Sequence, residues 1–242
     1  MLQVLRTYSP ARTVTIIGLA GLLAIASTFV SLANLVRAKS PEFALRLIPF
    51  DAEAHISAAE RLFLKAPSKA QAREAQALAA TAFNRDGTLA QSFRIMGMAS
   101  AVLGQDGRAS KMFAQSDRLS RRDLPARLWL IEDAVNRGDM NGALGHFDVA
   151  LRTSSAASDL LFPILENAVD DPEVAKAALP LFRANPPWLG SFVSHVVSSE
   201  HDATALAALV AQLPERVKQV DEPLRMALVQ KLATTGKPFE AF

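Results

Sequence analysis

The chain has 242 residues, half of them apolar, with 26 basic and 24 acidic side chains and no cysteine. The absence of cysteine excludes disulfide scaffolds, thiolate metal sites, thiol nucleophiles and iron–sulfur clusters, and 11 Gly with 13 Pro are too few for collagen or low-complexity disorder. Residues 1–46 hold five basic groups and one acid, so the rest of the chain has 21 basic against 23 acidic groups. A slightly acidic body with one Tyr offers neither the basic patch nor the stacking aromatics that nucleic-acid binding needs, so no nucleic-acid partner is expected.

Residues 13–36 form a run of 24 residues without a charge, between Arg12 and Arg37. A helix of this length measures about 36 Å and would cross a hydrocarbon core of about 30 Å. We therefore predict a cytoplasmic tail over 1–12, a transmembrane helix over 13–36, a linker over 37–50 and a body over 51–242. The basic N-terminus favours a single-pass protein of a bacterial inner membrane with its body in the periplasm. A cleaved secretory signal is the alternative, although its apolar stretch is normally shorter.

The body contains a repeat with a period of 34 residues. The clearest pair of copies aligns Gly104, Ala109, Phe113 and Ser116 with Gly138, Ala143, Phe147 and Ala150. The same register extends backward to Ala70, Ala75, Ala79 and Ala82, and forward to Pro172, Ala177, Leu181 and Ala184. Upstream of these quartets it aligns two more columns, which are Leu62, Met96, Leu130 and Ile164, and Ala66, Ser100, Ala134 and Ala168.

Apolar and small residues within each copy recur at i, i+4 and i+7, which is the spacing of one helix face. Each copy is therefore predicted to form two short helices, with Gly104 and Gly138 in the turns between them. Ser68-x-x-Gln71 and Thr88-x-x-Gln91 have the spacing of a capping box, and Asp171 before Pro172 predicts another helix start. No stretch alternates as a strand would, so the predicted fold class is all-α.

A helix-turn-helix unit of 34 residues resembles the tetratricopeptide repeat (TPR), which has a Gly, an A-x3-F pair and a small residue at these offsets. The resemblance is carried by the two central copies, 90–123 and 124–157, and extends to 56–89 and 158–191. It departs from the family at the end of each first helix, where a small residue replaces the aromatic. The resemblance implies a right-handed α-solenoid, here following the transmembrane helix.

Beyond residue 191 the pattern becomes divergent. Helices are predicted over Phe192–Ser199, Ala203–Leu213 and Glu222–Thr235, and Gly236 to Ala241 repeats the Gly-x4-Ala spacing, so the chain stops where a further helix should begin. We expect a sequence truncated at its C-terminus, or a natural end that frays after Gly236.

The sequence contains no recognisable catalytic, cofactor or metal motif. The four His do not form an HExxH pair, and GxSxG, GxxxxGK[ST] and GxGxxG motifs are absent. His195, Glu200 and His201 could meet around a metal, but two ordinary histidines are the preferred interpretation. We therefore predict that the protein is not an enzyme and uses no cofactor.

By resemblance to TPR proteins, the first helix of each pair should line a concave groove that binds protein. The candidate groove residues are Glu60, Arg94, Met98, Glu132, Asn136, Asp159, Phe162 and Glu166. This set leans acidic and would suit a peptide or helix with basic groups and an apolar anchor. Trp188 could contact a partner, although a buried position between repeats is preferred.

The predicted function is a membrane-tethered scaffold that binds envelope or membrane proteins during bacterial cell-envelope assembly, for example polysaccharide synthesis or export. An accessory role at the secretion translocon or in cytochrome maturation is an alternative. Another is an anchor and docking arm for an enzyme domain beyond Phe242. These expectations rest on analogy with single-span TPR proteins.

Overall fold

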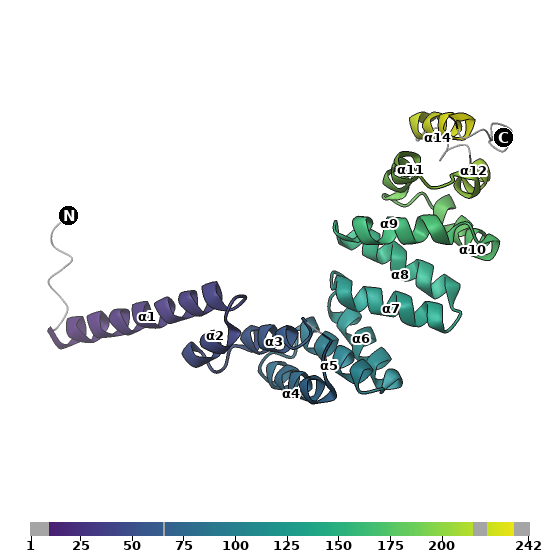
Figure 1. The fold of residues 1–242 in the computed structure, drawn as a ribbon. Coiled ribbons are helices and arrows are strands. Elements are labelled where there is room, and N and C mark those ends of the chain that lie inside the picture. Colours follow the sequence, from purple (N-terminus) through teal and green to yellow (C-terminus); the bar gives the residue numbers. More distant parts are fainter. Residues whose placement is uncertain (1–9, 65, 215–221, 235–242) are drawn as a thin grey trace, which may run out of the picture. The chain divides into compact units, whose positions relative to one another are not determined.

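The computed structural model describes residues 10–64, 66–214 and 222–234, in which every regular element is a helix. The predicted all-α class is confirmed for these residues. The chain divides into two units, residues 1–112 and 113–242, and each is described by itself. The first contains α1 (Pro10–Val36), α2 (Pro41–Leu47), α3 (Ala52–Arg61), α4 (Lys69–Arg85), α5 (Ala90–Val102) and the first turns of α6 (Asp106–Leu119) (Figure 1). The second contains the rest of α6, followed by α7 (Leu124–Asn136), α8 (Met140–Thr153), α9 (Ala157–Ala168), α10 (Pro172–Arg183), α11 (Leu189–Ser198), α12 (Thr204–Ala211) and α14 (Glu222–Thr234).

The transmembrane helix is the main prediction that the structure overturns. None of the helices in the described residues is both long enough and apolar enough to cross a bilayer. The prediction of a membrane span over 13–36 is therefore wrong, and so is the single-pass inner-membrane location with a periplasmic body.

The end of α1 shows why the absence of charge was misleading. Ala33 is fully buried in a small core with Ala44 of α2 and Ala54 of α3, so the last turns of α1 pack against protein. Directly after the helix, the Arg37 guanidinium forms ion pairs with Asp51 and Glu53. The lack of charged residues over 13–36 does not show whether lipid or protein covers the helix. The predicted linker over 37–50 is also partly helical, because α2 lies within it.

The first unit is built around α3, α4 and α5, each of which packs against the other two. The predicted capping box opens α4, with Ser68 and Gln71 bonding reciprocally to each other's backbone N–H. The buried side of α4 consists only of alanine, namely Ala72, Ala75, Ala79 and Ala82. Because alanine carries only a methyl group, the neighbouring backbones can approach α4 closely.

Glycines end the first helix in the two central copies, as predicted. Gly104 and Gly138 have φ angles of +74° and +71°, in the left-handed region that favours glycine. The N–H of Gln105 bonds to the Ser100 carbonyl at 2.9 Å, and the N–H of Asp139 bonds to the Ala134 carbonyl at the same distance. These are the six-to-one bonds of a Schellman motif.

Aspartates begin three helices of the second unit. The side chains of Asp123, Asp139 and Asp171 accept backbone N–H bonds at the starts of α7, α8 and α10, which confirms the predicted cap before Pro172.

The capping box predicted at Thr88 is wrong. The Thr88 hydroxyl bonds to Asp86 instead, and α5 begins after Leu89.

The helices of the second unit stack in successive pairs, as Figure 1 shows for α7 through α14. α8 packs against α7, α9 and α10, while α11 packs against α9 and α14, and α12 against α10 and α14. Each helix thus contacts a sequence neighbour, the helix two positions along, or both, which is the contact pattern of a helical-repeat stack. The aromatic residues Phe147, Phe162, Phe182, Trp188 and Phe192 lie in its continuous core.

The 34-residue register holds only as far as α8. Ala75, Ala109 and Ala143 are buried at equivalent positions of α4, α6 and α8. In α10, however, the buried residues are Val174, Ala178 and Phe182, which follow Ala143, Phe147 and Leu151 by 31 positions. The predicted fourth-copy column of Ala177, Leu181 and Ala184 is therefore wrong.

The loss of three residues occurs at the entry to α9. The loop before α9 has three residues, 154–156, whereas the loop before α7 has four, 120–123. In addition, α9 enters the core with its first residue, Ala157, whereas α7 enters with its third, Ala126. Together these two differences shift the buried positions by three.

The divergent helices beyond residue 191 are confirmed as α11, α12 and α14, with ends that differ by a few residues from the prediction. The predicted further helix at the end of the chain falls on residues 235–242, outside the described residues.

Candidate protein-binding face

In the first unit, Glu60 and Arg94 come from neighbouring first helices, α3 and α5, and meet in one polar pocket. Arg94 Nη2 donates to Glu60 Oε1 at 2.5 Å. The pocket has a volume of about 190 Å³ and is also lined by Arg37 and Glu53. Because both charges of the Glu60–Arg94 pair are already matched, this pocket has little net charge to offer a partner. Met98 lies half-buried against the core of the unit rather than in the pocket.

In the second unit, the groove candidates Glu132 and Asn136 on α7 and Asp159 on α9 are exposed. Within the part of the chain that the structure describes, neither Glu132 nor Asp159 has an ion pair or a hydrogen bond from its side chain. Their carboxylates therefore face solvent without a counter-charge.

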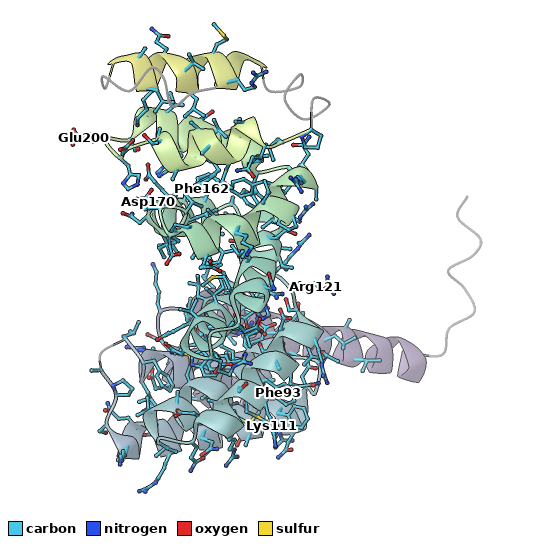
Figure 2. The ribbon with its side chains drawn as sticks, turned by 90° about the vertical axis from the view of Figure 1, so that its right-hand side faces the viewer. Phe93, Lys111, Arg121, Phe162, Asp170 and Glu200 are labelled. Carbon is cyan, nitrogen blue, oxygen red and sulfur yellow. The ribbon has the colours of Figure 1, made fainter. Side chains whose placement is uncertain are left out.

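The remaining two candidates, Phe162 and Glu166, are buried instead of facing a groove. Each is only 5% exposed. Phe162, which is labelled in Figure 2, packs against Phe192, and their ring centroids are 5.5 Å apart. The Glu166 carboxylate accepts a hydrogen bond from Ser199 and lies 3.2 Å from His195 Nε2. The three-residue shift explains the burial of Phe162, because it aligns Phe162 with the buried Ile131 of α7. It does not explain Glu166, which aligns with the exposed Val135 and is covered instead by the α11 side.

The same shift turns two large aliphatic side chains of α9 outward. Leu160 is 50% exposed and Ile164 is 54% exposed, with the exposed Asp159, Pro163 and Asn167 around them on the same side of the helix. The sequence columns had aligned Ile164 with the buried Leu130. A helical wheel of residues 157–168 alone separates Leu161 and Leu165 from Leu160 and Ile164, so this signal was present in the sequence.

We call the exposed side of α7, α9 and α11 the first-helix face of the second unit. Its members are the exposed residues Glu132, Val135, Asn136, Asp159, Leu160, Pro163, Ile164, Asn167, Ser191, Ser194 and Ser198. α9 and α11 contain no Lys or Arg, and Arg127 of α7 is buried. The face therefore combines aliphatic and acidic groups with a row of serines from α11.

Arg127 is held inside the unit by a polar cluster. Its guanidinium pairs with Asp117 of α6 and donates from Nη1 to His146 Nδ1 of α8 at 2.8 Å. Burial lowers the pKa of Arg127, and burial together with the charge of Arg127 lowers the pKa of His146. Because a guanidinium can only donate, His146 Nδ1 is the acceptor in this contact, and the cluster joins three helices behind the face.

The two histidines considered for a metal are taken by different carboxylates. His195 lies against Glu166, and His201 Nε2 lies 2.9 Å from Asp170 Oδ2. Figure 2 shows Asp170 and Glu200, which precedes His201, at the same edge of the stack. Across the described ranges, no three His, Asp or Glu side chains gather in a way that could hold a metal ion.

Trp188 is buried between repeats, the preferred of its two interpretations. It is 5% exposed, and its Nε1 donates to Asp148 Oδ1 of α8 at 2.9 Å. It therefore joins two helix pairs and does not belong to the first-helix face.

The chain matches no protein-family model, and no curated protein matches it in sequence.

Proposed function

We propose that the protein is a helical-repeat binding protein of the TPR type. In this proposal the first-helix face of the second unit binds a peptide or helix of another protein. The partner segment carries an aliphatic side chain that packs on Leu160 and Ile164, and basic groups that face Glu132 and Asp159. The observation that carries the proposal is the exposure of this aliphatic pair beside carboxylates that have no counter-charge among the residues that the structure describes.

The aliphatic pair supplies the affinity. Complete burial of a Leu or Ile side chain contributes about 1.5–3 kcal/mol, so covering the exposed half of each contributes about 1 kcal/mol. The two together would strengthen binding by roughly 30-fold. Apolar anchors of this kind are typical of helix-in-groove recognition.

The charge distribution supplies selectivity. A basic partner meets two unpaired carboxylates and no exposed cation on α9 or α11. An acidic partner would be repelled by the same groups. Each exposed pair contributes only about 0.2–1 kcal/mol, so charge selects the partner more than it holds it.

The pathway is left open in this proposal. The envelope-assembly role was inferred from a membrane anchor, and that anchor is not supported. The docking arm for a domain beyond Phe242, and the translocon and cytochrome-maturation roles, remain predictions.

Position-specific photocrosslinking in cells tests the proposal. A photoreactive phenylalanine replaces Glu132 or Ile164 on the first-helix face, and Arg183, an exposed residue of α10, as the control. We expect one crosslinked protein of the same mass from the two face positions and none from Arg183. Mass spectrometry of the adduct should locate a segment with basic and aliphatic residues.

Two variants then test the chemistry on a synthetic peptide of that segment. Ile164→Asp should weaken binding at least tenfold, and Glu132→Lys by about two- to fivefold. Glu173→Lys, the matched change on an exposed glutamate of α10, should leave binding unchanged. Equal crosslinking at all three positions, or equal loss of affinity in Glu132→Lys and Glu173→Lys, would exclude this face.

A further inference from the structure

A cleft lies on the other side of the second unit, between the second helices α10 and α12. Its volume is about 330 Å³. Val169, Ala175, Leu179, Ala205 and Leu209 supply apolar walls. Val169 and Leu209 are 2% and 3% exposed, so they form the floor of the cleft.

The cleft exists because α12 is short and presents small side chains. α12 has eight residues, whereas α10 has twelve and α8 has fourteen. The residues that α12 turns toward α10 include Ala205 and Ala208. Methyl groups at these two positions leave the space that larger side chains would fill.

Three polar side chains line the cleft, and two of them are already engaged. The Asp170 carboxylate binds His201 at 2.9 Å. The Gln212 amide donates to the Ala208 carbonyl at 3.0 Å. Lys176 is exposed at the edge of the cleft, and its ammonium group has no ion pair or hydrogen bond to any residue that the structure describes.

An exposed ammonium group at the edge of a cleft with an apolar floor is complementary to an amphiphilic monoanion, whose charge stays near solvent while its chain is covered. Ligand sites are typically apolar clefts of about 300–1,000 Å³ with a few polar groups that set orientation. We propose that this cleft binds a small aliphatic carboxylate. Its chain lies along Val169, Leu179 and Leu209, and its carboxylate pairs with Lys176.

The site shares no residue with the first-helix face, so the two proposals stand or fall separately.

Calorimetric titration of the full chain tests the proposal with sodium decanoate below its micellar concentration, and with decanol and decyltrimethylammonium as probes of equal chain length. We expect saturable binding of one decanoate, weaker binding of decanol, and none of the cation. Lys176→Gln should weaken decanoate at least fivefold and leave decanol unchanged. Lys111→Gln, on the exposed lysine of α6, is the matched control and should bind decanoate normally.

A second pair of variants tests the location. Ala208→Phe fills the cleft and should abolish binding of both decanoate and decanol, whereas Ala211→Phe, on an exposed α12 residue that does not line the cleft, should not. Circular dichroism checks that both variants fold. Equal affinity for decanoate and decyltrimethylammonium, normal decanoate binding by Lys176→Gln or Ala208→Phe, or no saturable binding at all would overturn the proposal.

Discussion

The shift in register after α8 makes a sharp prediction about two adjacent residues of α10. The 34-residue columns place Leu181 in the core, whereas the structure buries Phe182 completely and leaves Leu181 at the edge. Phe182 lies edge-on to Trp188 and to Phe192, with ring centroids 6.0 Å apart in each case. Truncating each residue to alanine therefore tests the register directly.

The structure sets the expected magnitudes. A fully buried Phe→Ala change costs about 3–5 kcal/mol, because it removes transfer free energy and leaves a cavity. A partly exposed Leu→Ala change costs about 1 kcal/mol, since fewer apolar atoms leave the core. We therefore expect Phe182→Ala to lower the free energy of unfolding by about 4 kcal/mol and Leu181→Ala by about 1 kcal/mol.

Urea unfolding followed by far-ultraviolet circular dichroism and by tryptophan fluorescence measures both variants. With a slope of about 2 kcal/mol per molar urea, the midpoints should fall by roughly 2 M and 0.5 M. If Phe182→Ala does not fold, Phe182→Leu supplies a milder test, with an expected cost still above that of Leu181→Ala. A larger loss for Leu181→Ala than for either Phe182 variant would refute the 31-residue register.

Three further predictions concern the cluster, the inter-repeat bond and one turn. His146 is neutral in the fold and has a pKa below its ordinary value of about 6.5, so the unfolded state binds more protons as the pH falls. The free energy of unfolding should therefore decrease from pH 7.5 to 5.5, and His146→Gln should flatten that decrease in urea titrations at each pH. Trp188→Phe removes the hydrogen bond to Asp148 and should cost about 1–2 kcal/mol in chemical unfolding, whereas an unchanged midpoint would show that the bond contributes nothing. Gly138→Ala meets no neighbouring atom but must adopt a positive φ, so thermal unfolding should report a loss of about 1–2 kcal/mol, and an unchanged melting temperature would mean that the turn relaxes.

The candidate site was only partly predictable. Glu132, Asn136 and Asp159 could be chosen from the sequence because a polar residue opposite a helix's apolar stripe is exposed in any arrangement of the helices. Leu160 and Ile164 were missed because the columns carried the register of α7 into α9. Glu166 was misplaced for a different reason, since its burial depends on the packing of α11, which supplies the Ser199 and His195 groups that make it tolerable.

Features that depend on a few neighbouring residues were determined by the sequence alone. They include the Ser68–Gln71 capping box, the aspartate cap before Pro172, the glycine turns at 104 and 138, and the alternation of short helices. These signals are local because they satisfy backbone hydrogen bonds within a single turn. The tertiary structure alone decided how deeply each helix enters the stack, what covers the end of α1, and where α10 and α12 leave a cleft. Such features depend on the volumes of side chains and on contacts between residues far apart in the chain. A repeat period cannot specify these contacts once a shorter loop and an earlier entry into the core shift the register, as they do at α9.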